Sequence, residues 1–196
     1  MEFYHSTTEE ARKSILANSY INPTKFDFSS YLDRVLPTLS EDSKLPKMLI
    51  GQRSVPYLLE GIYCFNVIEG ARTYRESGSV ITLSCDTPSE MLDVNDPNFL
   101  MRLDDFFNDE LMKIIELKIF DKEYVNYYRI LKEIILDYLY DIDNTDRDFP
   151  QIYAIMLFLF YNFKQENVPD VLFKQFPEFP YPYYVINNIS LVKQVS

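Results

Sequence analysis

Hydrophobic and polar positions in the first half of the chain predict three strands separated by two helices. Ala11 and Ile15 lie four positions apart and share one face of a helix, whereas the compact apolar runs around them favour strands. The predicted elements are strands over 3–5, 61–65 and 79–85 and helices over 9–17 and 67–76. The predicted order in the first half is therefore strand, helix, strand, helix, strand.

Two polar motifs predict where these helices begin. Thr7 is followed three positions later by Glu10, the pattern of a capping box in which each side chain satisfies a backbone amide at the helix start. Asn66 and Glu69 repeat this pattern before the second helix. His5, the only histidine of the chain, therefore lies at a corner between strand and helix, where a side chain is available to a ligand.

Longer helical periodicity replaces the short strands in the second half. Helices are predicted over 99–120, over 122–141 and after Pro150, and the closing segment 183–192 is predicted to be β-rich. The run 152–163 is apolar on all sides and, at about a dozen residues, is too short for a bilayer that needs roughly 20, so it predicts a buried helix. Residues 22–46 contain several Pro, Ser and Asp, which predicts mostly loop with one helical turn near 31–36.

Composition narrows the class of protein. A chain of 196 residues with 47% hydrophobic residues is expected to fold as one globular domain. Its net charge of −11 disfavours generic binding to nucleic acid or to an anionic membrane. Cys64 and Cys85 lack the spacing of metal ligands, so we expect two buried thiols and no metal. Without a signal-peptide pattern at the N-terminus, a cytoplasmic location is expected.

Three motifs stand in a definite order along the chain. They are Tyr4-His5-Ser6-Thr7, then Gly61-Ile62-Tyr63-Cys64-Phe65 with the helix 69–74, then Val80-Ile81-Thr82-Leu83 with a segment ending at Leu92-Asp93. Together they resemble the ADP-ribosyltransferase superfamily, in the histidine-tyrosine-glutamate branch that includes diphtheria-type toxins and poly-ADP-ribose polymerases. The resemblance implies an α+β fold with a split mixed β-sheet core. It makes 1–196 a single domain of this type, with 97–168 as a mainly helical insertion.

The resemblance also implies roles for individual residues. His5 would hydrogen-bond the adenine-side ribose of NAD, backbone groups around Ser6 would hold the nicotinamide amide, and Thr7 would orient His5 or cap the helix. Tyr63 would stack on the nicotinamide ring, whose flat cationic face prefers an aromatic platform. Gly61 would let the backbone approach the ligand. NAD is thus the implied substrate, and no metal is implied.

The chain departs from the family pattern at two positions. Ser6 stands where the family has glycine after the histidine. The family places glutamate, or in divergent members glutamine or aspartate, at the start of a late strand, and here that strand reads Pro-Tyr-Tyr-Val-Ile over 182–186. Glu178 is the nearest carboxylate upstream and is the candidate third catalytic residue. Tyr74 in the second helix is a further candidate for binding NAD.

These roles imply an NAD-dependent ADP-ribosyltransferase that modifies a macromolecular acceptor, as toxins and defence effectors of bacteria and phages do. The strong negative charge favours a protein target over nucleic acid. An antitoxin or inhibitor protein is a further partner of such proteins. The alternative is a catalytically inactive module that kept the fold, lost the acid, and binds NAD, ADP-ribose or a partner protein.

Each candidate residue also has a purely structural interpretation. His5 can be a corner histidine whose ring bonds a nearby carbonyl, and Tyr63 can be a core aromatic residue. Tyr74 can lie on a helix surface, and Glu178 can be a solvated loop residue between prolines. The central helices can form a core or a docking surface for a target. The sequence leaves these alternatives open.

Overall fold

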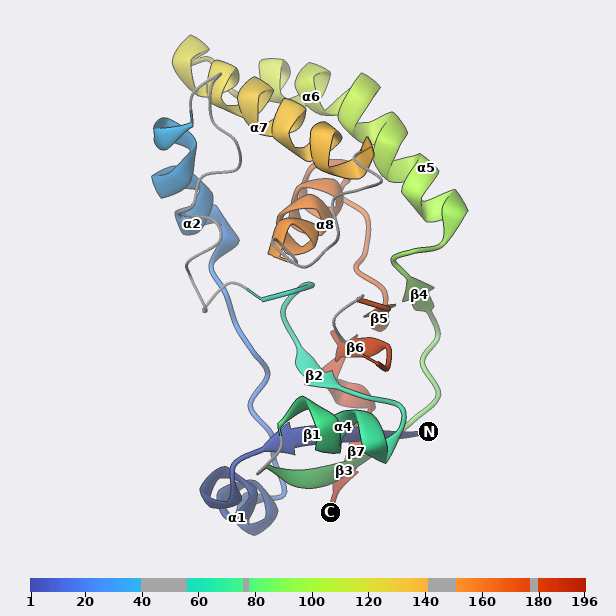
Figure 1. Ribbon diagram of the computed structural model, residues 1–196. Coiled ribbons are helices and arrows are strands. Elements are labelled where there is room, and N and C mark those ends of the chain that lie inside the picture. Colours follow the sequence, from blue (N-terminus) through green and yellow to red (C-terminus); the bar gives the residue numbers. More distant parts are fainter. Residues whose placement is uncertain (40–55, 76–77, 141–150, 177–179) are drawn as a thin grey trace. The chain divides into compact units, whose positions relative to one another are not determined.

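The computed structural model describes the chain except for residues 40–55, 76–77, 141–150 and 177–179. The described chain has mixed α+β structure, which confirms the expected class, and contains two small sheets (Figure 1). It divides into two compact units. Unit 1 comprises 1–25, 59–95 and 168–196, and unit 2 comprises 26–58 and 96–167. Of the helical stretch expected over 97–168, residues 97–167 fall in unit 2 and residue 168 falls in unit 1.

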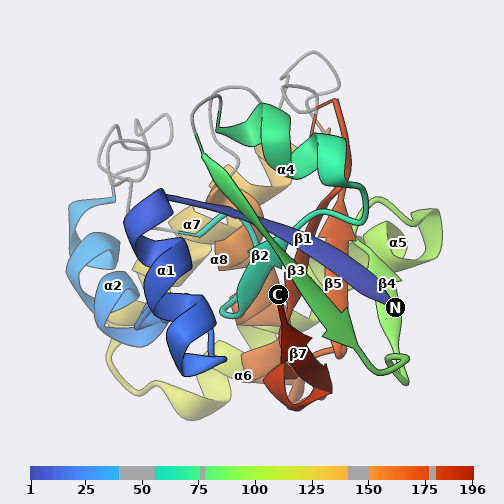
Figure 2. The same ribbon diagram turned by 90° about the horizontal axis from the view of Figure 1, so that it is seen from below.

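Unit 1 contains both sheets. The first sheet has the order β1 (Glu2–Thr7), β3 (Ser79–Cys85) and β7 (Val192–Val195), and both of its pairings are antiparallel. The second sheet has the order β2 (Ile62–Cys64), β6 (Tyr183–Ile186), β5 (Val171–Lys174) and β4 (Met91–Asp93). Its β4–β5 pairing is parallel and the other two are antiparallel. In Figure 2 the pair β1 and β3 crosses over the strands of the second sheet.

Side chains from both sheets meet in one apolar core. Successive residues of a strand point to opposite faces, so Phe3 and His5 of β1 point to the same face, opposite Leu83 and Ile81 of β3. The core consists of Phe3, Ile21, Ile62, Cys64, Ile81, Leu83, Cys85, Val171, Tyr184 and Ile186. Each fully buried aliphatic side chain of this kind contributes about 1.5–3 kcal/mol. Burial of these side chains stabilises the packing of the two sheets against each other.

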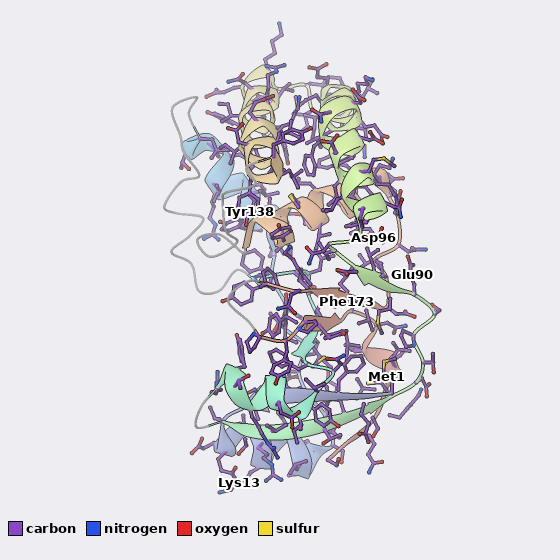
Figure 3. The ribbon with its side chains drawn as sticks, turned by 45° about the vertical axis from the view of Figure 1, so that its right-hand side comes forward. Met1, Lys13, Glu90, Asp96, Tyr138 and Phe173 are labelled. Atoms are coloured by element: carbon purple, nitrogen blue, oxygen red, sulfur yellow. The ribbon has the colours of Figure 1, made fainter. Side chains whose placement is uncertain are left out.

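Aromatic rings and the two cysteines also pack in or against this core. Phe173 of β5, which is labelled in Figure 3, stacks on Tyr184 of β6, with ring centres 5.0 Å apart and planes at 19°. Met1 anchors the chain start, because its ammonium group donates to the Cys85 carbonyl at 2.8 Å. Cys64 and Cys85 are free and buried, which confirms the expectation of two buried thiols.

Three shorter helical elements complete unit 1. They are α1 (Glu9–Asn18), α4 (Ile68–Tyr74) and the 3₁₀ turn η3 (Ile189–Leu191). Helix α4 lies next to β1 in both views (Figures 1 and 2). It approaches the segment after β2 closely because Gly70 has no side chain: an added Cβ would lie 2.7 Å from the Phe65 ring. A small residue at this position therefore sets how near the helix lies to the sheet.

Unit 2 is helical. Its elements are α2 (Phe28–Val35), the 3₁₀ turn η1 (Leu36–Thr38), α5 (Pro97–Asp105), the π-helical turn η2 (Phe106–Glu110), α6 (Leu111–Lys118), α7 (Lys122–Tyr140) and α8 (Gln151–Lys164). The apolar run 152–163 forms most of α8, and its residues from Ala154 to Leu157 are fully buried, so the prediction of a buried helix is confirmed. None of the described helices is long and apolar enough to cross a membrane.

The helix caps differ from the predicted ones. Thr7 is the last residue of β1 and is buried, and Thr8 is the N-cap of α1, with its hydroxyl accepting from the Ala11 amide at 3.2 Å. The predicted capping box at Thr7 is therefore wrong by one position, because pairing of Thr7 with Ser79 extends the strand. The predicted cap at Asn66 is also wrong, since Val67 occupies the N-cap of α4 and makes no side-chain cap bond.

Gly61 adopts a backbone conformation that other residues rarely accept. Its φ is +152°, and a Cβ at this position would lie 2.5 Å from the Ile186 carbonyl oxygen and 2.7 Å from Val185 Cγ2. The residue also forms a two-bond bridge with Thr24, at 2.7 and 3.0 Å. The glycine of the Gly-x-Tyr motif therefore allows β2 and β6 to approach each other at the start of their pairing.

Substituting Gly61→Ala is expected to lower the free energy of unfolding by about 1–3 kcal/mol from the backbone conformation, with the contact to Ile186 adding to this loss. Chemical denaturation measures the change. The matched control is Gly78→Ala, where the nearest atoms at 3.0 Å belong to side chains and φ is not left-handed, so a smaller loss is expected. Equal stability of the two variants would contradict the role given to Gly61.

Candidate functional site

The centre of the candidate site is a hydrogen bond between the only histidine and the backbone of β2. His5 lies in β1 and is half-buried, and its Nδ1 is 2.7 Å from the Tyr63 carbonyl oxygen. A carbonyl oxygen only accepts hydrogen bonds, so Nδ1 must carry the proton. In the neutral imidazole this leaves Nε2 with a lone pair that can accept a hydrogen bond from a ligand hydroxyl.

The surroundings keep this imidazole neutral. Burial lowers the pKa of His5 below its ordinary value of 6.5, the bond to the Tyr63 carbonyl raises it, and the positive charge of Arg75 lowers it further, with a net decrease. At neutral pH the ring is therefore an uncharged donor through Nδ1 and an acceptor through Nε2. This protonation state suits contact with a hydroxyl group rather than with an anion.

The two residues after His5 point in different directions. Thr7 lies on the same face as His5 and is buried, next to Ser79 of β3. Ser6 lies on the opposite face, and its Oγ is 3.0 Å from the place where a Cβ of Gly78 would stand. Within the described part of the chain, this buried Oγ has no hydrogen-bond partner. The Ser6 side chain therefore points toward Gly78, on the face of β1 away from His5.

Both the hydroxyl group and the ring of Tyr63 make contacts that hold its side chain in place. Its hydroxyl donates to the Leu59 carbonyl at 2.7 Å, and its ring lies 5.2 Å from the ring of Tyr183, with the planes at 36°. On β2 it lies on the face opposite Ile62 and Cys64, which belong to the core. Tyr63 is therefore outside the core between the sheets, although it is half-buried.

Four aromatic rings form a cluster on this face, which we call the aromatic cluster: Tyr63, Phe65, Tyr74 and Tyr183. Tyr183 contacts the other three, at 5.2 Å to Tyr63, 5.1 Å to Phe65 and 5.4 Å to Tyr74. Its ring is stacked on that of Tyr74 at 28°, and Phe65 lies 5.7 Å from Tyr74. These separations are typical of favourable aromatic pairs, each worth about 0.5–1.5 kcal/mol.

The structure brings several of the predicted residues together. His5 contacts the backbone of Tyr63, while Tyr63 and Tyr74 are joined through Tyr183. Glu178 lies outside the described residues. The first residue of β6, the strand at whose start the resemblance predicts a carboxylate, is Tyr183. The described residues contain no group of three or more His, Cys, Asp or Glu side chains that would hold a metal ion.

Sequence reasoning misses two residues of this region. The sequence indicates Tyr183 only as part of a strand without an acid, because a tyrosine at a strand start does not reveal which face it occupies. Arg75 follows α4 directly and lies near enough to His5 to lower the pKa of the imidazole. Tyr183 lies two residues before Val185, and Val185 pairs with Tyr63 across the two strands. This spacing places Tyr183 on the same face as Tyr63 and is the one signal that could have indicated its position.

Comparison with known proteins finds no matching family model, no matching curated protein and no matching solved structure. The chemistry of the site is therefore argued from its own geometry. It offers a neutral imidazole acceptor, a glycine that brings two strands close together and an aromatic cluster in which Tyr74 and Tyr183 are stacked. Such a set suits a ligand that has both hydroxyl groups and flat rings.

The His5 imidazole is expected to titrate with a midpoint below 6.5 in the folded protein. Because the chain has one histidine, a single imidazole proton resonance in an NMR pH titration reports it directly. The unfolded chain binds this proton at higher pH, so the free energy of unfolding falls as pH decreases from about 6.5 through the folded-state pKa. Unfolding in urea supplies the reference midpoint, and Arg75→Ala is expected to raise the folded one. A folded midpoint at or above the urea value would contradict the assignment.

Proposed function

We propose that the chain is an NAD-dependent ADP-ribosyltransferase that transfers ADP-ribose to a macromolecular acceptor. The observation that supports this most strongly is the 2.7 Å bond from His5 Nδ1 to the Tyr63 carbonyl. It holds the histidine of the first motif next to the tyrosine of the second, although 58 positions separate them. The two motifs that resemble the family thus meet at one place in unit 1.

The arrangement of the strands supports an ADP-ribosyltransferase-like fold. Strand β1 belongs to the first sheet but is joined to Phe65, just after β2, by one bridge, in which Tyr4 and Phe65 exchange backbone bonds of 2.8 and 2.9 Å. Along its whole length β1 pairs with β3, whereas β2 pairs with β6. This connection between the two sheets supports the proposed split mixed sheet, in which His5 directly follows the bridging residue Tyr4.

The proposed chemistry needs three groups. Nε2 of His5 would accept a hydrogen bond from a ribose hydroxyl, and the ring of Tyr63 would bind the nicotinamide face. Cleavage of the bond between nicotinamide and ribose passes through an oxocarbenium-like transition state, which a nearby carboxylate stabilises. Glu178 is the proposed carboxylate, as the nearest acid upstream of β6 in the sequence.

A second candidate function is a module that binds NAD, ADP-ribose or a partner protein without turnover. The observation in its favour is Tyr183, which occupies the first position of β6 in place of an acid. A tyrosine side chain carries no carboxylate. For either function, the net charge of −11 favours a protein partner over nucleic acid, and an antitoxin or inhibitor protein is a further proposed partner.

Release of nicotinamide from NAD is expected for the intact chain, and His5→Ala and Tyr63→Ala are each expected to reduce it on the order of a hundredfold, because both remove a group that positions the substrate. A coupled assay of free nicotinamide measures the rate. Tyr20→Ala is the matched control, since Tyr20 is 52% exposed and lies outside the aromatic cluster. Turnover that neither site substitution changes would remove the enzyme proposal.

Ligand binding separates the two candidate functions. NAD or ADP-ribose at 100 times its dissociation constant is expected to stabilise the folded chain by about 2.7 kcal/mol, which thermal or chemical unfolding detects. Stabilisation without release of nicotinamide supports the binding module. Stabilisation with release supports the transferase, and the absence of both contradicts the two proposals together.

A further inference from the structure

The apolar stripe of α7 continues beyond the buried core of unit 2. Tyr128, Leu131 and Ile135 on this stripe are buried. Residues three and four positions apart share one face of a helix, so Tyr124 and Tyr127 lie on the same face nearer the start of α7. Both are half-buried, and their rings lie 6.0 Å apart with the planes at 70°. The stripe therefore ends in two aromatic rings that are partly open to solvent.

Three carboxylates lie beside these two rings. Asp33 of α2 accepts a hydrogen bond from the Tyr124 hydroxyl at 3.3 Å, and Glu123 accepts one from the Tyr127 hydroxyl. Asp121 accepts from the Glu123 and Tyr124 amides at 2.9 and 3.4 Å at the start of α7. Within the residues that the structure describes, none of the three carboxylates forms an ion pair. We call these five residues the acidic tyrosine patch.

The neighbouring cations are directed elsewhere. The ammonium of Lys118 lies 5.5 Å from the centre of the Phe163 ring, and Arg34 Nε donates to a backbone carbonyl of its own helix at 3.3 Å. Lys122 lies two positions before Tyr124, which places it on the other side of α7 from that ring. These three cations therefore do not neutralise the patch by direct contact.

The tyrosine hydroxyls respond to the same negative charges. Burial and the charge of Asp33 raise the pKa of Tyr124, and the hydrogen bond to Glu123 raises the pKa of Tyr127. Burial, with a contribution from Asp33, raises the pKa of Tyr128 to about 12. The rings therefore stay uncharged at neutral pH, and the charge of the patch comes from its carboxylates.

Exposed apolar side chains adjoin the patch in the sequence. Phe120, which directly precedes Asp121, is 94% exposed, and Leu117 in the last turn of α6 is 79% exposed. Helices α6 and α7 pack against each other on either side of this turn (Figure 1). Apolar groups gathered at an exposed position next to polar ones are typical of a surface that contacts another protein.

From these observations we propose that the acidic tyrosine patch and Phe120 form a docking surface for a basic segment of a partner protein. An arginine or lysine side chain of the segment lies against the faces of Tyr124 and Tyr127, because the face of an aromatic ring attracts a cation. The carboxylates supply the complementary charge, and an apolar side chain of the segment covers Phe120. The surface lies within unit 2, so the inference does not rest on the proposed NAD function.

The test uses a fluorescently labelled synthetic peptide of alternating arginine and leucine, and fluorescence anisotropy measures its dissociation constant. A peptide with glutamine in place of arginine shows whether the positive charge is needed. Tyr127→Leu removes one ring, and Glu123→Gln removes one charge. The matched controls are Tyr140→Leu, in an exposed residue at the other end of α7, and Asp105→Asn, in an exposed residue of α5.

The intact chain is expected to bind the arginine peptide and not the glutamine peptide. Tyr127→Leu and Glu123→Gln are each expected to weaken binding at least about threefold, and added salt is expected to weaken it further. Tyr127→Phe keeps the ring and is expected to behave as the wild type, as are both controls. Phe120→Ser is expected to weaken binding of this peptide, but not of one with serine in place of leucine.

Three results overturn the inference. The first is no binding of the arginine peptide by the intact chain. The second is an equal loss from Asp105→Asn and Glu123→Gln, which would mean that the net charge of −11 attracts the peptide without a defined site. The third is self-association in analytical ultracentrifugation that Phe120→Ser abolishes, because the surface would then bind a second copy of the chain.

Thermal unfolding confirms that each variant is folded. If Tyr127→Leu fails to fold, Glu123→Gln and Phe120→Ser decide the test, since both change exposed residues. None of these measurements uses NAD. The failure of this inference and the failure of the proposed function are therefore distinguishable.

Discussion

The site depends on one constraint of the backbone. Pairing between β1 and the segment that begins with β2 is limited to a single bridge. Residues two apart on a strand direct their backbone groups to the same side, so the Tyr63 carbonyl faces β1 as the Phe65 carbonyl does. Phe65 is paired with Tyr4, but this pairing is an isolated bridge, and no strand continues alongside Tyr63 on this side among the described residues. The imidazole of His5 satisfies the carbonyl instead. Nδ1 of His5 therefore has the structural role, and the proposed contact with a ligand is left to Nε2 of the same ring.

This bond also fixes the electrostatics of the site. The chain has a net charge of −11, which favours protonation of a histidine at long range, yet burial and Arg75 lower the pKa of His5. The local effects outweigh the long-range field, because exposed charges more than about 10 Å away are largely screened by salt. A neutral ring with a fixed tautomer can accept a hydrogen bond from a hydroxyl group, whereas a protonated ring has no acceptor. The pKa shift thus follows from the same burial that positions the ring.

Local patterns predict the elements of this fold better than they predict its boundaries and its site. Strand β3 is predicted over its observed residues, since one of its faces is regularly buried. Strand β5 is missed, because its parallel pairing with β4 joins segments 80 positions apart and no local pattern reports that. The helix predicted over 99–120 contains a π-helical turn at Phe106–Glu110, where both phenylalanines are fully buried. The sequence points to His5 and Tyr63 as site residues, but it does not reveal that Tyr183 contacts Tyr63.

Tyr183 shows how stability and ligand binding compete within one group of side chains. Three aromatic contacts on a single ring stabilise the start of β6 by about 1.5–4.5 kcal/mol if each has its usual value. A carboxylate at the same position would lose these contacts and incur a desolvation cost beside them. A chain with tyrosine here is therefore more stable at this corner, and the proposed transferase function has to place its negative charge on another segment. The proposed transferase assigns that charge to Glu178, whereas the proposed binding module needs no such charge, so the two proposals share His5 and Tyr63 and differ at this one group.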